Sequence, residues 1–170
     1  MEKSTKGKIS FEKGYYEGDI VDGKPNGVGI YHDPDDEIDY EGEWVDGKLH
    51  GKGRVYAITN RFIYEGDFIN GEYHGKGKLD VEYNVYEGDF EEGYFHGKGK
   101  YINLDFKNGY TYEGDFEYDE QTGNGKKTYE DGIIEEGYFV IGKLNGNGKI
   151  IYPDGKVEEG NWIKGKLVEE

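Results

Sequence analysis

Residues 64–78 read YEGDFINGEYHGKGK, and this stretch decides the fold that the sequence predicts. Its first five residues alternate between apolar and polar, which is typical of a β-strand with one buried and one exposed face. The dipeptide Asn70-Gly71 favours a tight hairpin turn, because glycine adopts a positive φ without a Cβ clash. The stretch therefore predicts a β-hairpin whose second strand carries the glycine pair Gly75 and Gly77.

The same pattern recurs along the whole chain. If the first tyrosine is position 0, position 2 is always glycine, position 4 is large and apolar, and a Gly-x-Gly pair follows. Position 7 is a turn glycine in every copy except one, where Asp119 replaces it. A fixed period of this length is the mark of a repeat architecture. The copies begin at Tyr16, Tyr40, Tyr64, Tyr86 and Tyr112, with degenerate copies at Glu135 and Glu158.

The block Tyr64-Glu-Gly-Asp-Phe, followed by Gly71 and by His74-Gly-Lys-Gly-Lys, resembles the MORN (membrane occupation and recognition nexus) repeat almost residue for residue. The resemblance covers essentially the whole chain, although the last copies lose the turn glycine or the leading tyrosine. It implies an all-β fold: an elongated, twisted and curved single-layer antiparallel sheet of tandem β-hairpins.

The repeats place the chain in a single array. Residues 7–14 match residues 148–155, which predicts that the chain opens with a lone second strand. We therefore expect an N-terminal half-repeat over 1–15, six repeats over 16–157 and a C-terminal half-repeat over 158–170. This arrangement predicts about 14 strands.

Composition limits the classes of function. The formal net charge of -16, from 21 Lys plus Arg against 37 Asp plus Glu, opposes binding to nucleic acid and to anionic lipid. The chain has no cysteine, so it has no disulfide, thiolate metal site or cysteine nucleophile. No stretch resembles a signal peptide or a membrane span, and the default expectation is a cytoplasmic protein.

Neither a metal site nor a catalytic site stands out. His50, His74 and His96 share one column, but equivalent residues of adjacent hairpins lie about 9 to 10 Å apart, too far to share one zinc ion. The acidic run 33–39 lacks the ligand spacing of an EF-hand and is expected to be a solvated loop. No nucleophile with a base can be inferred, so we expect no cofactor, no metal and no enzymatic activity.

The large aromatic residues at positions 0 and 4 of the repeats predict the partner-binding surface. Large rings on one strand are expected to lie over backbone where the neighbouring strand carries the paired glycines. On the opposite face, Glu65 and Asp67 are expected to meet Lys76 and Lys78. The predicted partner-binding residues, which form an aromatic stripe, are Tyr40, Trp44, Tyr64, Phe68, Tyr86, Phe90, Tyr112 and Phe116. The alternative is that these rings stack on their own glycines and expose little.

These observations predict a protein-binding scaffold or adaptor. The resemblance implies grooves similar to those that hold a partner helix in adaptor proteins, and the acidic scaffold suits a helix or extended peptide with basic residues. One alternative is a self-assembling structural protein, including a homodimer, that associates through the aromatic face or the terminal half-repeats. Association with membrane lipids is a further alternative that the net charge disfavours.

Overall fold

The structure is a computed structural model that describes residues 4–35, 37–57 and 62–168. Within these residues the chain forms strands and turns and has no helix, and hence no helix long and apolar enough to cross a membrane. The chain divides into two compact units, Met1–Asp80 and Val81–Glu170, which are described separately. The predicted all-β fold of tandem antiparallel hairpins is confirmed.

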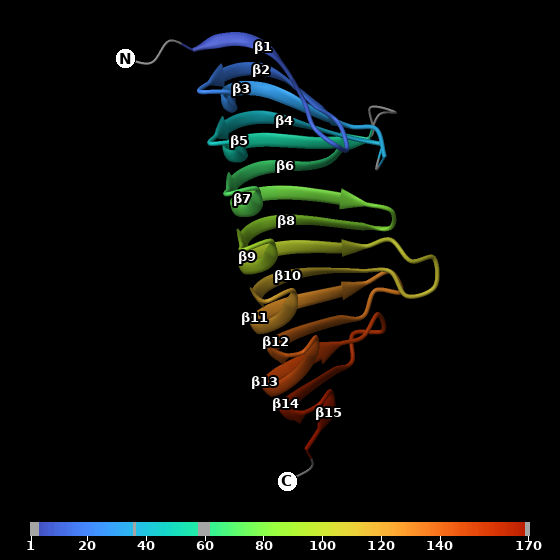
Figure 1. Cartoon of the computed structure of the whole chain (residues 1–170). Helices are drawn as coiled ribbons and strands as arrows, with labels where there is room; N and C mark the ends of the chain where they lie inside the picture. Colours follow the sequence, from blue (N-terminus) through green and yellow to red (C-terminus); the bar gives the residue numbers. More distant parts are fainter. Residues whose placement is uncertain (1–3, 36, 58–61, 169–170) are drawn as a thin grey trace. The chain divides into compact units, whose positions relative to one another are not determined.

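The first unit contains seven strands, and each pairs antiparallel with its neighbours in the sequence (Figure 1). They are β1 (Thr5–Ser10), β2 (Tyr15–Val21), β3 (Lys24–Asp33), β4 (Ile38–Val45), β5 (Lys48–Ala57), β6 (Phe62–Ile69) and β7 (Glu72–Val81).

The second unit contains eight strands with the same sequential antiparallel pairing. They are β8 (Asn84–Glu91), β9 (Tyr94–Asn103), β10 (Tyr110–Glu117), β11 (Glu120–Tyr129), β12 (Ile134–Val140), β13 (Lys143–Ile151), β14 (Val157–Ile163) and β15 (Lys166–Leu167).

The two ends of the array differ in how well the sequence predicted them. β1 pairs with β2 through Gly7 opposite Gly18, as expected of a lone second strand. At the C-terminal end, β14 was expected to stand alone, but the short β15 follows it and places Leu167 opposite Trp162. The described residues therefore form 15 strands rather than about 14.

The hairpin turns follow the predicted chemistry. Asp46 and Gly47, for example, both have positive φ, at 50° and 85°, as a two-residue type I′ turn requires. The turn persists where the glycine is missing, because Asp119 itself takes a φ of 67°. Aspartate tolerates this left-handed region better than most residues.

A β-bulge gives the two glycines of each pair different roles. In β6 and β7 the register runs Gly66 opposite Gly77 and then shifts, so that Asp67 stands opposite His74. The first glycine of the pair, Gly75, lies in the bulge with a φ of 56° and not under an aromatic ring. The prediction that both glycines lie under the rings is therefore wrong for the first, because the bulge turns it away.

The bulge also explains the aspartate at position 3. Bulging frees a backbone N–H from the ladder, and a buried N–H needs a partner. Lys76 N donates to Asp67 Oδ2 at 3.1 Å. In the same way, the backbone N–H groups of Val28, Lys98 and Asn124 donate to the carboxylates of Asp19, Asp89 and Asp115, respectively.

Several exposed ion pairs join neighbouring hairpins, whereas the sequence predicted pairs within one hairpin; Lys149 and Glu136, 3.4 Å apart on β13 and β12, do pair within a hairpin. Lys52 Nζ lies 2.6 Å from Asp67 Oδ1 and Arg54 Nη2 lies 2.8 Å from Glu65 Oε1, so these ion pairs connect β5 to β6. Of the expected pairs within the hairpin, Glu65 does stand opposite Lys78, but the bulge places Asp67 opposite His74 and out of register with Lys76. Lys98–Asp115 and Lys100–Glu113 connect β9 to β10 in the same manner.

Candidate functional site

A tyrosine ring covers the glycines in four of the repeats. A Cβ added at Gly77 would lie 2.7 Å from the Tyr64 ring atoms Cε2 and Cζ, so only glycine fits there. The Tyr64 hydroxyl donates to the carbonyl oxygen of Asp67 at 3.0 Å. Burial raises the pKa of Tyr64 above its usual range, which keeps the hydroxyl protonated as a donor. Tyr16, Tyr86 and Tyr112 make the equivalent bond.

In two of these repeats an aromatic residue at position 9 covers the outer side of the tyrosine ring. Tyr73 stacks on Tyr64 with ring centroids 3.7 Å apart, and Phe95 stacks on Tyr86 at 3.8 Å. Tyr64 and Tyr86 are therefore each held between glycine backbone and a second ring. The sequence reasoning did not single out position 9, although its large residues recur once per repeat.

Most of the predicted aromatic stripe is core rather than surface. The exposed fraction is 8% for Trp44, 0% for Tyr64 and Tyr112, 1% for Phe68 and Tyr86, and 3% for Phe90 and Phe116. The rings with 0–3% exposure offer a partner little contact area, because glycine lets them sink onto their own backbone, whereas Trp44 keeps a small exposed surface. Only Tyr40 of the eight is partly exposed.

The repeat that begins at Tyr40 departs from the others because position 9 is leucine. A Cβ at Gly42 would lie 3.3 Å from Leu49 Cδ2, and no Tyr40 atom is among its three nearest neighbours. Leu144 behaves in the same way, 2.9 Å from a Cβ at Gly148, in a repeat that has no leading tyrosine. Leu49 thus takes the place that a tyrosine ring occupies elsewhere, and Tyr40 is left to one side.

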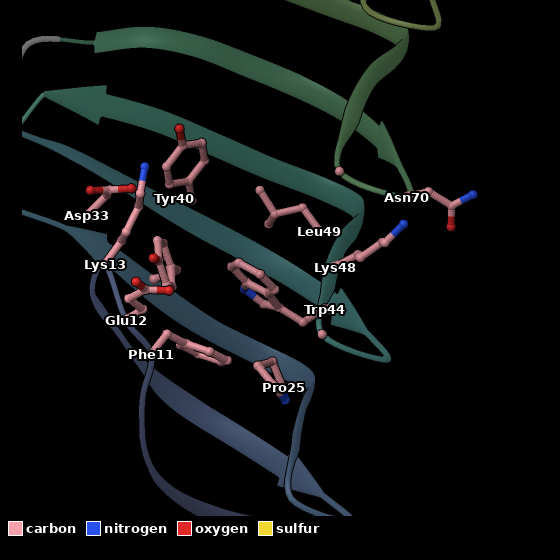
Figure 2. Close-up of a pocket in the computed structure, with 13 residues that line it drawn as sticks. Phe11, Glu12, Lys13, Pro25, Asp33, Tyr40, Trp44, Lys48, Leu49 and Asn70 are labelled. Carbon is pink, nitrogen blue, oxygen red and sulfur yellow. The ribbon is translucent and has the colours of Figure 1, made fainter. Parts of the chain in front are cut away.

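An open pocket of about 630 Å³ lies beside the displaced Tyr40, and we call it the aromatic pocket (Figure 2). Its residues come from the β1–β2 turn, strands β3, β4 and β5, and the β4–β5 and β6–β7 turns. The lining residues are Phe11, Glu12, Lys13, Pro25, Tyr31, Asp33, Tyr40, Trp44, Gly47, Lys48, Leu49, Asn70 and Gly71.

Hydrogen bonds and ring contacts fix the walls of the aromatic pocket. Trp44 Nε1 donates to the carbonyl oxygen of Gly29 at 3.0 Å, which holds the indole against β3. Phe11 sits in a turn closed by the bond from its own N to Gly14 O at 2.8 Å, and its ring is 48% exposed. Tyr31 lies between these rings, so the wall is largely set before any partner arrives.

Charged side chains stand at one end of the aromatic pocket. Asp33 was expected in a solvated loop but ends strand β3 with only 8% exposure, and its Oδ1 accepts from Asp35 N at 3.1 Å. Figure 2 shows the Lys13 nitrogen turned toward Tyr40 and Asp33, with the Glu12 carboxylate nearby. Asp36, within the same acidic run, lies outside the described residues.

The second unit carries a buried polar cluster that sequence reasoning also missed. Lys127 is 6% exposed, donates to Gly142 O at 2.8 Å and lies 4.6 Å from the Tyr110 ring centroid. Burial lowers the pKa of Lys127. Gln121 Nε2 donates to Tyr110 Oη at 3.2 Å, while its buried Oε1 has no hydrogen-bond partner. Polar residues at positions 9 and 15, where other repeats are apolar, are the signal that marks this cluster.

The histidine column does not form a metal site in the described part of the chain, where no three side chains of His, Asp or Glu come together to hold an ion. His96 Nε2 instead lies 3.1 Å from Glu91 Oε2. His74 stands opposite Asp67 in the sheet.

Comparison with protein-family models gives one match, to the MORN repeat. The model matches residues 16–37, 40–56, 64–80, 86–103, 112–134 and 136–157, which together are more than half of the chain. A search of the curated proteins finds no match.

Proposed function

The chain belongs to the MORN repeat family, and from that premise we propose that it is a non-catalytic scaffold that binds a partner protein through the aromatic pocket. MORN repeats are in general protein- or membrane-interaction repeats and are a non-catalytic repeat type. The observation that supports the proposal is the displacement of Tyr40 by Leu49, which leaves an aromatic pocket open in a repeat array whose other leading rings are buried.

The pocket has the size and lining of a peptide anchor site. Its volume of about 630 Å³ lies within the range of roughly 300–1,000 Å³ that is usual for ligand pockets. Tyrosine and tryptophan are typical anchors at interfaces, because each gives a large contact area while fixing few rotatable bonds. A partner segment, as a helix or an extended peptide, would insert one or two side chains between Phe11, Tyr40 and Trp44.

The charge of the scaffold selects the partner. A net charge of -16 attracts a basic segment and repels nucleic acid over distances set by the salt concentration. This attraction mainly raises the association rate, while the pocket contacts set the dissociation rate. We therefore propose a basic partner segment with an anchor side chain.

A displayed peptide library tests the proposal. Peptides selected on the whole chain are titrated against the wild type and Tyr40→Leu, which keeps apolar bulk but removes the ring. We expect an affinity loss of about tenfold, since one anchor ring contributes about 1–2 kcal/mol. Tyr138→Leu, at a 45% exposed tyrosine of the second unit, is the matched control and should leave the affinity unchanged.

Light scattering of the same samples at several concentrations separates partner binding from self-assembly. A monomer that binds the selected peptides supports the proposal. A mass that rises with concentration in the wild type but not in Tyr40→Leu would assign the pocket to a second copy and overturn it. Selected peptides that ignore Tyr40→Leu would overturn it as well.

A further inference from the structure

Four aromatic rings line the aromatic pocket, and three of them, Phe11, Tyr40 and Trp44, lie beside the fourth, Tyr31. The centroid of the Tyr31 ring lies 5.9 Å from that of Phe11, 6.1 Å from that of Tyr40 and 6.5 Å from that of Trp44. The planes are tilted against one another by 50° to 59°, so the rings do not close into a flat stack. A group above Tyr31 would have aromatic surface on several sides.

Negative charge reinforces this arrangement. Two carboxylates, those of Asp33 and Glu12, line the pocket beside two lysines, Lys13 and Lys48. Asp33 is almost fully buried, whereas both lysines are exposed. The faces of aromatic rings carry negative electrostatic potential and attract a cation that lies within about 6 Å of the centroid. The rings and the buried Asp33 carboxylate therefore favour positive charge in the pocket, while the side chains of the two exposed lysines can turn into water.

Lys13 also brings an ammonium group to the edge of the pocket. Figure 2 shows the terminal nitrogen of Lys13 turned toward Tyr40 and Asp33 from the β1–β2 turn. Lys13 lies in a bend and is exposed, so its side chain can swing out of the pocket without disturbing a strand. Its charge at the edge of the pocket would compete with that of a ligand cation.

We propose that the aromatic pocket binds an N-methylated ammonium group, the trimethylated lysine side chain of the partner protein. The inference rests on the proposed function, since it names the anchor of the partner segment. The trimethylammonium head would lie among Phe11, Tyr31, Tyr40 and Trp44, with Asp33 balancing its charge.

Methylation matters because of hydration. An unmethylated ammonium is compact, strongly hydrated and needs hydrogen-bond acceptors for its three N–H groups. Rings cannot replace those water molecules. A trimethylammonium group has no N–H, is bulkier and less hydrated, and keeps the charge that the rings attract, which is why aromatic cages recognise it.

Calorimetric titration of the whole chain tests the proposal with three forms of N-acetyl-lysine amide. One is unmethylated, one is trimethylated, and in the third a neutral tert-butyl group of the same shape replaces the trimethylammonium. We expect the trimethylated form to bind about tenfold more tightly than either of the other two. If the tert-butyl form bound as tightly as the trimethylated form, the pocket would recognise only the shape of the group and not its charge, which would overturn the proposal.

Variants assign the effect to the site. Tyr40→Leu and Asp33→Asn should each remove most of the preference for the trimethylated form. Lys13→Ala should strengthen its binding about threefold, because the competing charge is gone. Tyr138→Leu should change nothing, and thermal unfolding checks that each variant is folded. A preference that survives both Tyr40→Leu and Asp33→Asn would place the binding elsewhere and contradict the proposal.

The same titration with choline distinguishes the source of the group. Binding of the trimethyl-lysine compound at least as tight as that of choline supports a protein side chain, whereas much tighter choline binding would point to a free or lipid headgroup and overturn it. If library peptides need Tyr40 but show no preference for methylation, this inference fails while the proposed function stands. If no peptide needs Tyr40, the proposed function fails irrespective of the titrations.

Discussion

The side chain of Leu49 lies over Gly42, with its Cδ2 3.3 Å from the position that a Cβ on that glycine would occupy. In the repeats that begin at Tyr64, Tyr86 and Tyr112, the leading tyrosine itself covers the corresponding glycine. One leucine at position 9 therefore turns Tyr40 from a core residue into the wall of a pocket. The site arises from a local exception to a packing rule that the other repeats with a leading tyrosine obey.

Leu49→Tyr should close the aromatic pocket. The new ring can stack on Tyr40, as Tyr73 stacks on Tyr64 at 3.7 Å, and so press Tyr40 onto Gly42 and its neighbouring glycine. We expect ring-current upfield shifts of the Gly42 α-protons in nuclear magnetic resonance spectra, together with an affinity loss for selected peptides of about tenfold. Unchanged glycine shifts would show that leucine is not what holds Tyr40 away.

Gly77→Ala should destabilise the first unit far more than Gly71→Ala. The new methyl group at residue 77 would overlap the Tyr64 ring, and overpacking of this kind costs typically about 1–3 kcal/mol. Nothing lies within 4 Å of a Cβ at Gly71, so only its φ of 91° is unfavourable for alanine, at about 1 kcal/mol. Chemical denaturation measures both free energies of unfolding. Equal losses in the free energy of unfolding for the two variants would contradict the account in which the Tyr64 ring packs directly on Gly77.

Ile141→Asn should stabilise the second unit. Ile141 occupies the first turn position with a φ of 49°, a region in which a β-branched side chain is strained, and it is 68% exposed. The equivalent turn residue Asn70 has a φ of 55° and suits that conformation. We expect a gain of about 1 kcal/mol in the free energy of unfolding. A loss of stability would mean that the exposed isoleucine packs on something that offsets its strain.

Lys127→Leu should also stabilise the second unit, by about 1 kcal/mol, because the charge of a nearly buried ammonium is no longer desolvated. Burial lowers the pKa of Lys127 in the folded state below its ordinary value of 10.5. The penalty is therefore complete below the folded-state pKa and shrinks as the pH rises from there toward 10.5, where the unfolded lysine also loses its proton. The difference between wild type and variant should narrow over that range. A constant difference would mean that packing, not charge, distinguishes the two chains.

The fold should be lost in alkali as the buried tyrosines ionise. Burial raises the pKa of Tyr73 to about 12 and raises those of Tyr64, Tyr86 and Tyr112 further. Since these folded-state values exceed the ordinary 10.0, their stabilising contribution is complete below pH 10 and declines as the pH rises above it. Ultraviolet absorbance of phenolate and near-ultraviolet circular dichroism should change together. Full ionisation of the tyrosines at pH 10 with the fold intact would contradict their burial.

The repeat made most of the fold predictable from the sequence. The alternation of apolar and polar residues, the turn dipeptides and the repeat period each depend on the local backbone, so the sequence predicted the hairpins correctly. The bulge at Gly75 was not, because its signal is the aspartate that accepts the freed N–H, and Asp67 looked like an ordinary exposed acid. The short β15 was missed because its two residues carry no alternating pattern.

The candidate site was less predictable for a physical reason. The alternation of residues along a strand shows which face of the sheet carries a ring, but it does not decide whether that ring faces solvent or lies on glycine backbone. Tyr64 and Phe68, which are 0% and 1% exposed, follow the alternative in which the rings stack on the glycines of the sheet and expose little surface. Tyr40 and Trp44 line the pocket because of Leu49 and of Phe11 in the β1–β2 turn, a three-dimensional relationship between different strands.

The most direct test of partner binding at the aromatic pocket is a nitrogen–proton correlation spectrum of the whole chain recorded with and without a selected peptide. We expect the largest shifts at the amides of Tyr40 and Leu49 and at the Trp44 indole N–H, with small changes in the second unit. Large shifts confined to residues outside the pocket, with those three signals unmoved, would contradict the account.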